Sequence, residues 1–288
     1  MKEQAVSFGE NNHLLGVLSE PRIKHTDLPA VIILNSGLLH KVGPFGLNTE
    51  LSRTIAENGF NVLRFDLSGI GDSKISLKEG NRWEKAIRDT RHAMNYIHEI
   101  CGSKEFVLIG LCSGSDNAHR ISLVEERVIG AVHLDGYSFR NALYYVKYYG
   151  ERMICRKLLI KKIREFTARI DYSKKIESEK SNVPSMAYLD REFPAKEKAV
   201  EDFKLLVSRG VKLLYVFTGG VENYNNYKNQ LRDSLREVNF QNFLDLEYFP
   251  YAQHTYATIK SRKRVINKVV NWLDTNFGLS NSLEKTAP

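Results

Sequence analysis

The chain has 288 residues, of which 42% are hydrophobic and 26% are charged, and its formal net charge is +8. This balance is typical of a soluble globular protein and excludes disordered, collagen-like and coiled-coil chains. The longest nearly apolar run, 30–39, has about half of the roughly 20 residues that span a bilayer, and the N-terminus is polar, so we expect a cytoplasmic protein without a membrane span.

Short apolar segments alternate with amphipathic ones along most of the chain. The first two, 5–8 and 14–18, flank the turn residues 9–12 and predict a hairpin. Later strands are expected at 30–35, 61–66, 106–110, 130–135, 212–218 and 244–249, and helices at 48–58, 83–100, 115–125, 224–237 and 262–276. This order predicts an α/β fold with a mostly parallel central sheet and helices on both faces.

The segment 137–210 interrupts this alternation, because it is basic, rich in tyrosine and helical in character. Between Arg140 and Arg164 it holds eight basic residues against one acid, Glu151. We expect a core domain from 1–136 and 211–278, a helical cap inserted at 137–210, and a flexible tail at 279–288.

The sharpest local motif is the turn 110–114, which reads GLCSG and lies between an apolar strand and a helix. A side chain at the tip of a tight strand-to-helix turn needs small residues two positions before and after it. Centring this frame on Cys112 places glycine at both positions, whereas centring it on Ser113 or Ser115 does not. The helix that starts here directs its N–H groups at the sulfur and favours a thiolate. The alternative is a small apolar residue packed in a turn.

Four stretches carry a resemblance to a known family: NSGLLHKVGP (35–44), LRFDLSGIGDS (63–73), GLCSGS (110–115) and HTYA (254–257). The chain resembles the α/β-hydrolase superfamily, and within it a cysteine-elbow subgroup that includes exosortase-associated hydrolases and shares its nucleophile type with dienelactone hydrolases. The resemblance implies the α/β-hydrolase fold, a mostly parallel sheet flanked by helices, with a helical cap.

The resemblance also implies a nucleophile, an acid and a histidine in that chain order. Among the eight histidines, His254 follows the final strand and is the expected base, whereas His119 and His133 lie inside predicted elements and read as structural. Two carboxylates are candidates for the acid. Glu222 follows the strand 212–218 and is the first choice, and Asp135, which ends the strand 130–135, is the alternative.

The oxyanion hole is expected from the backbone N–H groups of Ser113 and Leu38, where Gly37 lets the backbone approach closely. The glycine-rich loop 69–71 lacks the apolar helix that a dinucleotide site requires. The three cysteines, Cys101, Cys112 and Cys155, have no metal-site spacing. We therefore expect neither a cofactor nor a metal.

These observations predict an enzyme that cleaves or transfers an acyl group from an ester or thioester through acyl-Cys112. Hydrolysis, as in an esterase or thioesterase, is favoured, and transfer to an amine or alcohol is the alternative. The basic insertion, through Lys161, Lys162 and Tyr145, is expected to bind the substrate, carried on acyl carrier protein or coenzyme A. A non-catalytic binding module, and a nucleic-acid-binding surface on the insertion, are the rival interpretations. The oligomeric state is left open.

Overall fold

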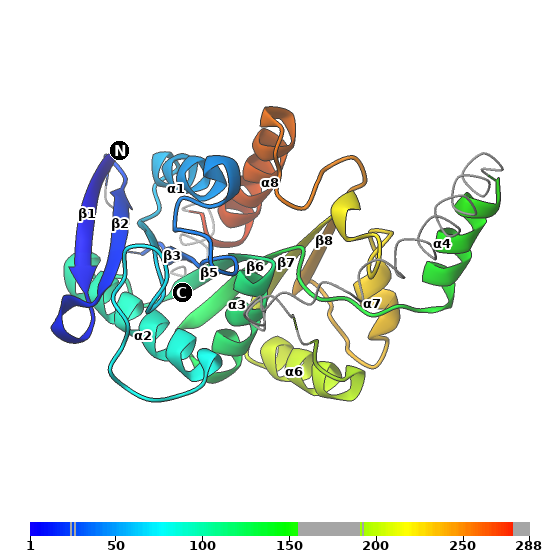
Figure 1. Cartoon of the computed structure of the whole chain (residues 1–288), viewed down its shortest axis with the longest axis horizontal. Helices are drawn as coiled ribbons and strands as arrows, with labels where there is room; N and C mark the ends of the chain where they lie inside the picture. Colours follow the sequence, from blue (N-terminus) through cyan, green and yellow to red (C-terminus); the bar gives the residue numbers. More distant parts are fainter. Residues whose placement is uncertain (24, 26, 155–190, 192, 279–288) are drawn as a thin grey trace, which may run out of the picture.

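The computed structural model describes residues 1–23, 25, 27–154, 191 and 193–278, and every structural statement below concerns these residues. They form one eight-stranded sheet with helices on both faces (Figure 1). The strands are β1 (Lys2–Phe8), β2 (Leu14–Glu20), β3 (Ala30–Ile33), β4 (Val62–Phe65), β5 (Phe106–Leu111), β6 (Val128–Leu134), β7 (Lys212–Thr218) and β8 (Leu244–Phe249). The helices are α1 (Leu47–Glu57), α2 (Arg82–Cys101), α3 (Ser113–Val124), α4 (Ala142–Ile154), α6 (Lys196–Ser208), α7 (Gln230–Ser234) and α8 (Ile259–Phe277). Three short 3-10 turns are η1 (Glu10–Asn12), η2 (Pro44–Gly46) and η3 (Gly219–Val221).

The strand order is β1-β2-β4-β3-β5-β6-β7-β8. β1 pairs antiparallel with β2, and β2 pairs antiparallel with β4, which confirms the predicted hairpin. In the order β4-β3-β5-β6-β7-β8, each strand pairs parallel with the next. The sequence prediction of an α/β fold with a mostly parallel sheet is therefore confirmed.

Both faces of the sheet are covered, which explains why the central strands are apolar throughout. All four residues of β3 are buried, and they alternate between two core clusters. Val31 and Ile33 pack with α1 and α8, whereas Ala30 and Ile32 pack with α2 and α3. Figure 1 shows α1 and α8 on one side of the sheet and α2, α3 and α6 on the other.

One segment differs clearly from the expected elements. The helix expected at 224–237 is reduced to α7, because the preceding residues use side chain–backbone hydrogen bonds instead. The amide of Gln230 donates to the Tyr224 carbonyl and accepts from the Asn226 N–H, which closes a loop. The predicted helix at 224–237 is therefore wrong in its extent, since only Gln230–Ser234 is helical.

The described residues of the segment 137–210 include two helices, α4 and α6, which lie apart from each other (Figure 1). α6 packs on the sheet, since Phe203 is fully buried against Tyr215 of β7 and Phe240. α4 projects from the edge of the molecule beyond α7 (Figure 1). The residues 155–190 and the tail 279–288 lie outside the described residues. None of the described helices combines the length and the hydropathy that crossing a membrane requires.

Candidate active site

Cys112 lies at the tip of the turn between β5 and α3 in a strained backbone conformation. Its φ of 57° and ψ of −121° fall where residues other than glycine rarely lie. A Cβ on Gly110 would come within 2.1 Å of the Gly114 backbone, and a Cβ on Gly114 would come within 2.5 Å of the Asn35 carbonyl oxygen. Both glycines are therefore required by close backbone contacts, as the sequence motif predicts.

His254 and Asp135 form a hydrogen-bonded pair next to this turn. His254 Nδ1 lies 2.8 Å from Asp135 Oδ2, so Nδ1 carries the proton and Nε2 faces the Cys112 thiol, with which His254 also hydrogen-bonds. Asp135 is fully buried and accepts bonds from the Thr218 N–H (2.7 Å) and Oγ1 (2.8 Å). Glu222 is exposed at the end of η3. Of the two candidate acids, Asp135 is the one that the structure places on the imidazole.

The loop that carries His254 packs closely against two glycines that follow β7. A Cβ on Gly219 would lie 2.0 Å from the Pro250 carbonyl oxygen, and a Cβ on Gly220 would lie 2.4 Å from the backbone nitrogen of His254. Any side chain at either glycine would push this loop away. The Gly219–Gly220 pair thus lets the imidazole approach the ends of β6 and β7.

The electrostatics of the pair favour a thiolate and an imidazolium. Burial raises the pKa of the Cys112 thiol, but the hydrogen bond with His254 and the charge of Arg191 lower it. A hydrogen bond from the Ser113 N–H lowers it further, so the pKa of Cys112 lies below its ordinary value. The hydrogen bonds with Asp135 and Cys112 raise the pKa of His254 to about 9, against the opposing effect of burial. Both shifts favour the thiolate–imidazolium form of the pair.

Arg191 is a site residue that the sequence analysis missed. Its guanidinium binds the Asp116 carboxylate of α3 through two bonds of 2.8 Å. It also donates to the Asp135 carbonyl and the Tyr224 hydroxyl, each at 3.1 Å. Because this bidentate geometry fixes a planar cation close enough to influence the Cys112 thiol, Arg191 contributes to the charge balance of the site.

The loop between β3 and α1 is tied to the turn at Cys112 by two hydrogen bonds. The Ser36 hydroxyl donates to the Leu111 carbonyl (2.9 Å), and the Gly37 N–H donates to the Ser113 Oγ (2.6 Å). The Leu38 N–H has no acceptor among the described residues, and its side chain is 58% exposed. Gly37 has a positive φ of 56°, which suits glycine. The loop that carries the Leu38 N–H is therefore joined by hydrogen bonds to the turn that carries Ser113.

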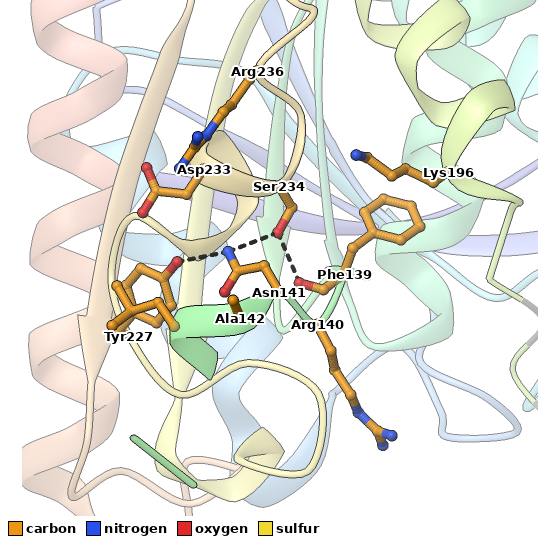
Figure 2. A pocket seen from close by; sticks show the side chains of 10 residues that line it. Phe139, Arg140, Asn141, Ala142, Lys196, Tyr227, Asp233, Ser234 and Arg236 are labelled. Atoms are coloured by element: carbon orange, nitrogen blue, oxygen red, sulfur yellow. Dashed lines mark hydrogen bonds between the residues drawn. The ribbon is translucent and has the colours of Figure 1, made fainter. Parts of the chain in front are cut away.

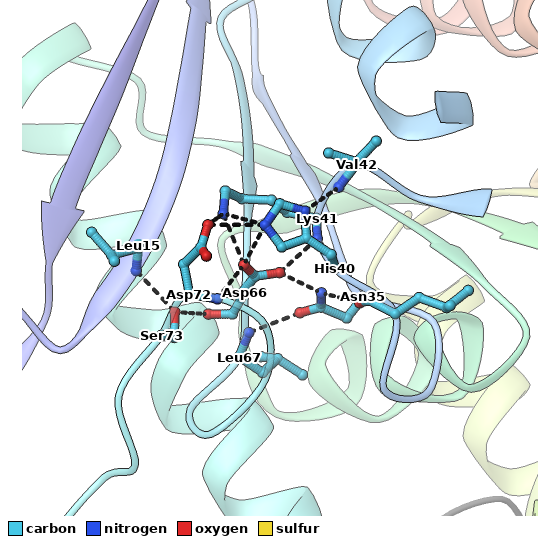
Figure 3. A network of polar contacts seen from close by, with 10 residues as sticks. Leu15, Asn35, His40, Lys41, Val42, Asp66, Leu67, Asp72 and Ser73 are labelled. Atoms are coloured by element: carbon cyan, nitrogen blue, oxygen red, sulfur yellow. Dashed lines mark hydrogen bonds and ion pairs between the residues drawn. The ribbon is translucent and has the colours of Figure 1, made fainter. Parts of the chain in front are cut away.

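Asp66, fully buried at the end of β4, holds this loop in place (Figure 3). Its carboxylate accepts bonds from the Asn35 amide (3.0 Å), the Lys41 N–H (2.6 Å), the Lys41 Nζ (2.9 Å) and the Asp72 N–H (3.1 Å). Hydrogen bonds from Lys41 and His40 lower the pKa of Asp72 to about 2. One buried carboxylate thus joins the loops that follow β3 and β4.

His40, Asp66 and Asp72 bring potential metal-ligand atoms within 4.8 Å of one another. The Lys41 Nζ contacts all three, at 2.9 Å from both Asp66 Oδ2 and His40 Nε2 and with a hydrogen bond to Asp72. The ammonium supplies the positive charge that these carboxylates need, so the group fits an internal ion pair rather than a metal centre.

The predicted substrate-binding residue Tyr145 makes none of these site contacts. It is on α4, 44% exposed, with its ring stacked on Tyr149, and α4 lies at the edge of the molecule beyond α7 (Figure 1). Lys161 and Lys162 lie outside the described residues. The buried His133 and His119 bond within the core, to Ser115 (2.9 Å) and Asp202 (3.3 Å) respectively.

A cavity of about 370 Å³ lies between the start of α4 and α7 (Figure 2). Asn141 bridges the Tyr227 hydroxyl (2.7 Å) and the Ser234 hydroxyl (3.2 Å) at its centre. Neither Cys112 nor His254 lines it. It is therefore separate from the thiol.

Comparisons with known proteins agree with this architecture. Residues 29–152 match the model of the α/β-hydrolase fold family. No curated protein matches the sequence. Among solved structures, a proline iminopeptidase of Mycobacterium smegmatis is 11% identical over 94% of this chain and 98% of that chain, with a TM-score of 0.59.

Two further solved structures are similar to the same extent. The α/β hydrolase GrgF of Penicillium sp. sh18 is 13% identical over 97% of this chain and 100% of that chain, with a TM-score of 0.59. A cold-adapted esterase from an Arctic intertidal metagenomic library is 12% identical over 96% and 93% of the two chains, with a TM-score of 0.53. The strand order and the family match together show that this chain has the α/β-hydrolase fold.

Proposed function

We propose that this protein is a hydrolase that cleaves an ester or thioester through an acyl-Cys112 intermediate. The observation that carries the proposal is the continuous hydrogen-bonded chain from the Cys112 thiol through His254 to the buried Asp135. A reactive cysteine needs a lowered pKa and an oriented base, and this site has both. The similar structures named as an esterase and an iminopeptidase support hydrolysis of an acyl bond.

In the first step, the Cys112 thiolate attacks the carbonyl carbon and forms the S–C bond. The negative charge moves to the carbonyl oxygen, where the N–H groups of Ser113 and Leu38 stabilise it. The bond to the leaving group then breaks, and the His254 imidazolium gives its proton to the departing oxygen or sulfur. Asp135 keeps the imidazole in the orientation that this transfer needs.

In the second step, the now neutral His254 takes a proton from water, and the resulting hydroxide oxygen bonds to the acyl carbon. The C–S bond breaks, which releases the carboxylic acid and restores the thiolate–imidazolium pair. An amine or alcohol in place of water gives acyl transfer, the alternative outcome. A thioester on coenzyme A or an acyl carrier protein is the donor class that we propose, because a thiolate exchanges readily with a thioester.

Intact-protein mass spectrometry with a panel of activated esters and thioesters tests the proposal. We expect wild type to gain one acyl mass, Cys112→Ala to gain none, and His254→Ala to gain it slowly and retain it. Cys101→Ala is the matched control, since it removes another cysteine thiol, at the end of α2.

The product distribution then separates hydrolysis from transfer. Free acid alone, with added amines and alcohols left unchanged, supports the hydrolase. Acylated amine or alcohol identifies a transferase. A thiol of ordinary reactivity that forms no adduct with any donor refutes catalysis and leaves a binding module on this fold.

A further inference from the structure

A second cavity, of about 380 Å³, adjoins the proposed oxyanion donors. Gly37, Leu38 and Ser113 are in its lining. The first turn of α2 also lines it, with Arg82, Trp83, Lys85 and Ala86. Cys112 itself does not line this cavity, but the adjacent residue Ser113 does, so an acyl group on Cys112 with its oxygen on these donors lies next to the cavity.

The middle of the cavity is apolar, with Leu67, Ile70 and Ile75 in its lining. Ile75 is 75% exposed and Leu38 is 58% exposed, so both leave uncovered apolar surface at the rim. Such surface suits the methylene groups of an acyl chain.

Cations gather next to Trp83, and two of them, Arg82 and Lys85, line the cavity, whereas Arg120 contacts the Trp83 ring from outside the lining. The guanidinium carbons of Arg82 and Arg120 each lie 4.0 Å from the Trp83 ring centroid. Lys85 is one helical turn from the start of α2 and lines the same cavity. Within the described residues, none of these three cations has a carboxylate partner.

Positive charges that lie close together repel one another, and a bound anion lowers this repulsion energy. The acidic residue in the lining, Asp89, does not neutralise them. It is 1% exposed, and its carboxylate accepts two bonds of 2.8 Å from the N–H and hydroxyl of Ser68. The cations therefore remain available to a ligand.

The two arginines come from different helices but converge on this ring. Ser113 and Asn117 line the cavity from α3, and Arg120 follows three residues later on the same helical face. At 1.5 Å per residue, Arg120 lies roughly 10 Å along α3 from the proposed oxyanion donor Ser113. This spacing suits an acyl chain of several carbons with a charge at its far end.

We infer that the Arg82–Trp83–Arg120 group with Lys85 is a carboxylate subsite, which selects acyl groups whose distal end is a carboxylate. The planar guanidinium fork matches a carboxylate, and the Trp83 ring orients both forks in advance. The apolar middle of the cavity favours a carboxylate on the acyl chain over a phosphate on the carrier. This inference rests on the proposed function, since it takes acyl-Cys112 as the reference point.

The test uses N-acetylcysteamine thioesters with acyl chains of four to eight carbons. Each half-acid thioester is paired with the neutral acyl thioester of the same number of carbons, so the leaving group is neutral and constant. We expect wild type to favour the half-acid by about 10-fold or more in kcat/KM. Arg82→Gln and Lys85→Gln should each lower that ratio about 10-fold, and Lys104→Gln, which removes one charge at the other end of α2, should not change it.

A wild type that is acylated by the neutral thioesters but shows no preference for the half-acids overturns the subsite and leaves the proposed function intact. Loss of preference in Lys104→Gln also overturns it. If Arg82→Gln lowers kcat/KM for a neutral acyl-coenzyme A but not the half-acid ratio, the cations bind the carrier phosphate instead, which likewise refutes the inference.

Binding measured without turnover separates the two proposals. Calorimetry on Cys112→Ser with a free dicarboxylic acid and the matching monocarboxylic acid reads the subsite directly. A preference for the dicarboxylic acid that Arg82→Gln abolishes supports the subsite even if no acyl adduct forms on wild type. Equal affinities contradict it.

Discussion

The two sides of the thiol are built in different ways. On one side, the proposed oxyanion donors depend on short segments, 35–41, 66–73 and 110–114, each of which is recognisable as a sequence motif. On the other side, Asp135, Arg191 and His254 come from three separate parts of the chain and meet through single hydrogen bonds and ion pairs. The first side is determined by local backbone geometry, and the second by long-range packing.

We expect the largest effect from removing the positive charge of Lys41, which lies in the segment 35–41 on the first side of the thiol. Lys41→Met leaves the buried Asp66 carboxylate without its ion-pair partner, since the Lys41 side chain is 7% exposed and that of Asp66 is not exposed. We expect unfolding free energy to fall by about 3–5 kcal/mol in urea denaturation. Lys104→Met is the exposed control and should change it by less than about 0.5 kcal/mol. Equal stability of the two variants would show that the Asp66 network does not hold this side together.

The second side is best tested by exchanging each candidate acid for its amide. Asp135→Asn removes the carboxylate that orients His254 and should lower kcat/KM about 100-fold, less than in serine enzymes because a thiol ionises more easily. Glu222→Gln, at an exposed position, should stay within about 3-fold of wild type. If Glu222→Gln lowers kcat/KM more than Asp135→Asn does, Glu222 rather than Asp135 is the acid.

A smaller effect is expected at Arg191. Arg191→Gln removes a positive charge that lowers the pKa of Cys112, so that pKa should rise. We therefore expect the pH profile of Cys112 alkylation by iodoacetamide to move to higher pH. Asp116→Asn loses the ion pair but keeps the Arg191 charge, and it should move the profile less. A profile that does not move in Arg191→Gln would exclude an electrostatic role for this residue.

The pH dependence of acylation should reveal both groups of the pair. The rate rises as Cys112 loses its proton, which occurs below the ordinary thiol pKa of 9.0. It falls as the His254 imidazolium, whose pKa is about 9, loses the proton needed by the leaving group. Single-turnover acylation between pH 5 and 10.5 should therefore decline above about pH 9, and His254→Ala should lack this decline.

Much of the fold could be predicted because the strands are apolar runs with clear boundaries. The segments 212–218 and 244–249 match β7 and β8 residue for residue. Where polar side chains compete for backbone bonds, as Gln230 does with Tyr224, the helical periodicity of 224–237 is misleading. The antiparallel hairpin was also predictable from its alternation.

Only part of the candidate site could be predicted. Cys112 follows from the glycine spacing of its turn, and the backbone contacts of Gly110 and Gly114 account for that spacing. Glu222 was favoured because it follows β7, yet Thr218 at the end of that strand donates two bonds to Asp135 instead. Arg191 lies in a segment without hydrophobic periodicity, so no local pattern indicated its contact with Asp116.

The ammonium of Lys41 sits among three groups that could otherwise ligate a cation, and it is covalently attached to the loop that it neutralises. A tethered counter-ion cannot be diluted, chelated or exchanged, so the shape of this loop is independent of the ions in the surrounding solution. The same attachment creates a single point of vulnerability, because acetylation of that one amine would remove the charge while leaving every neighbouring residue unchanged.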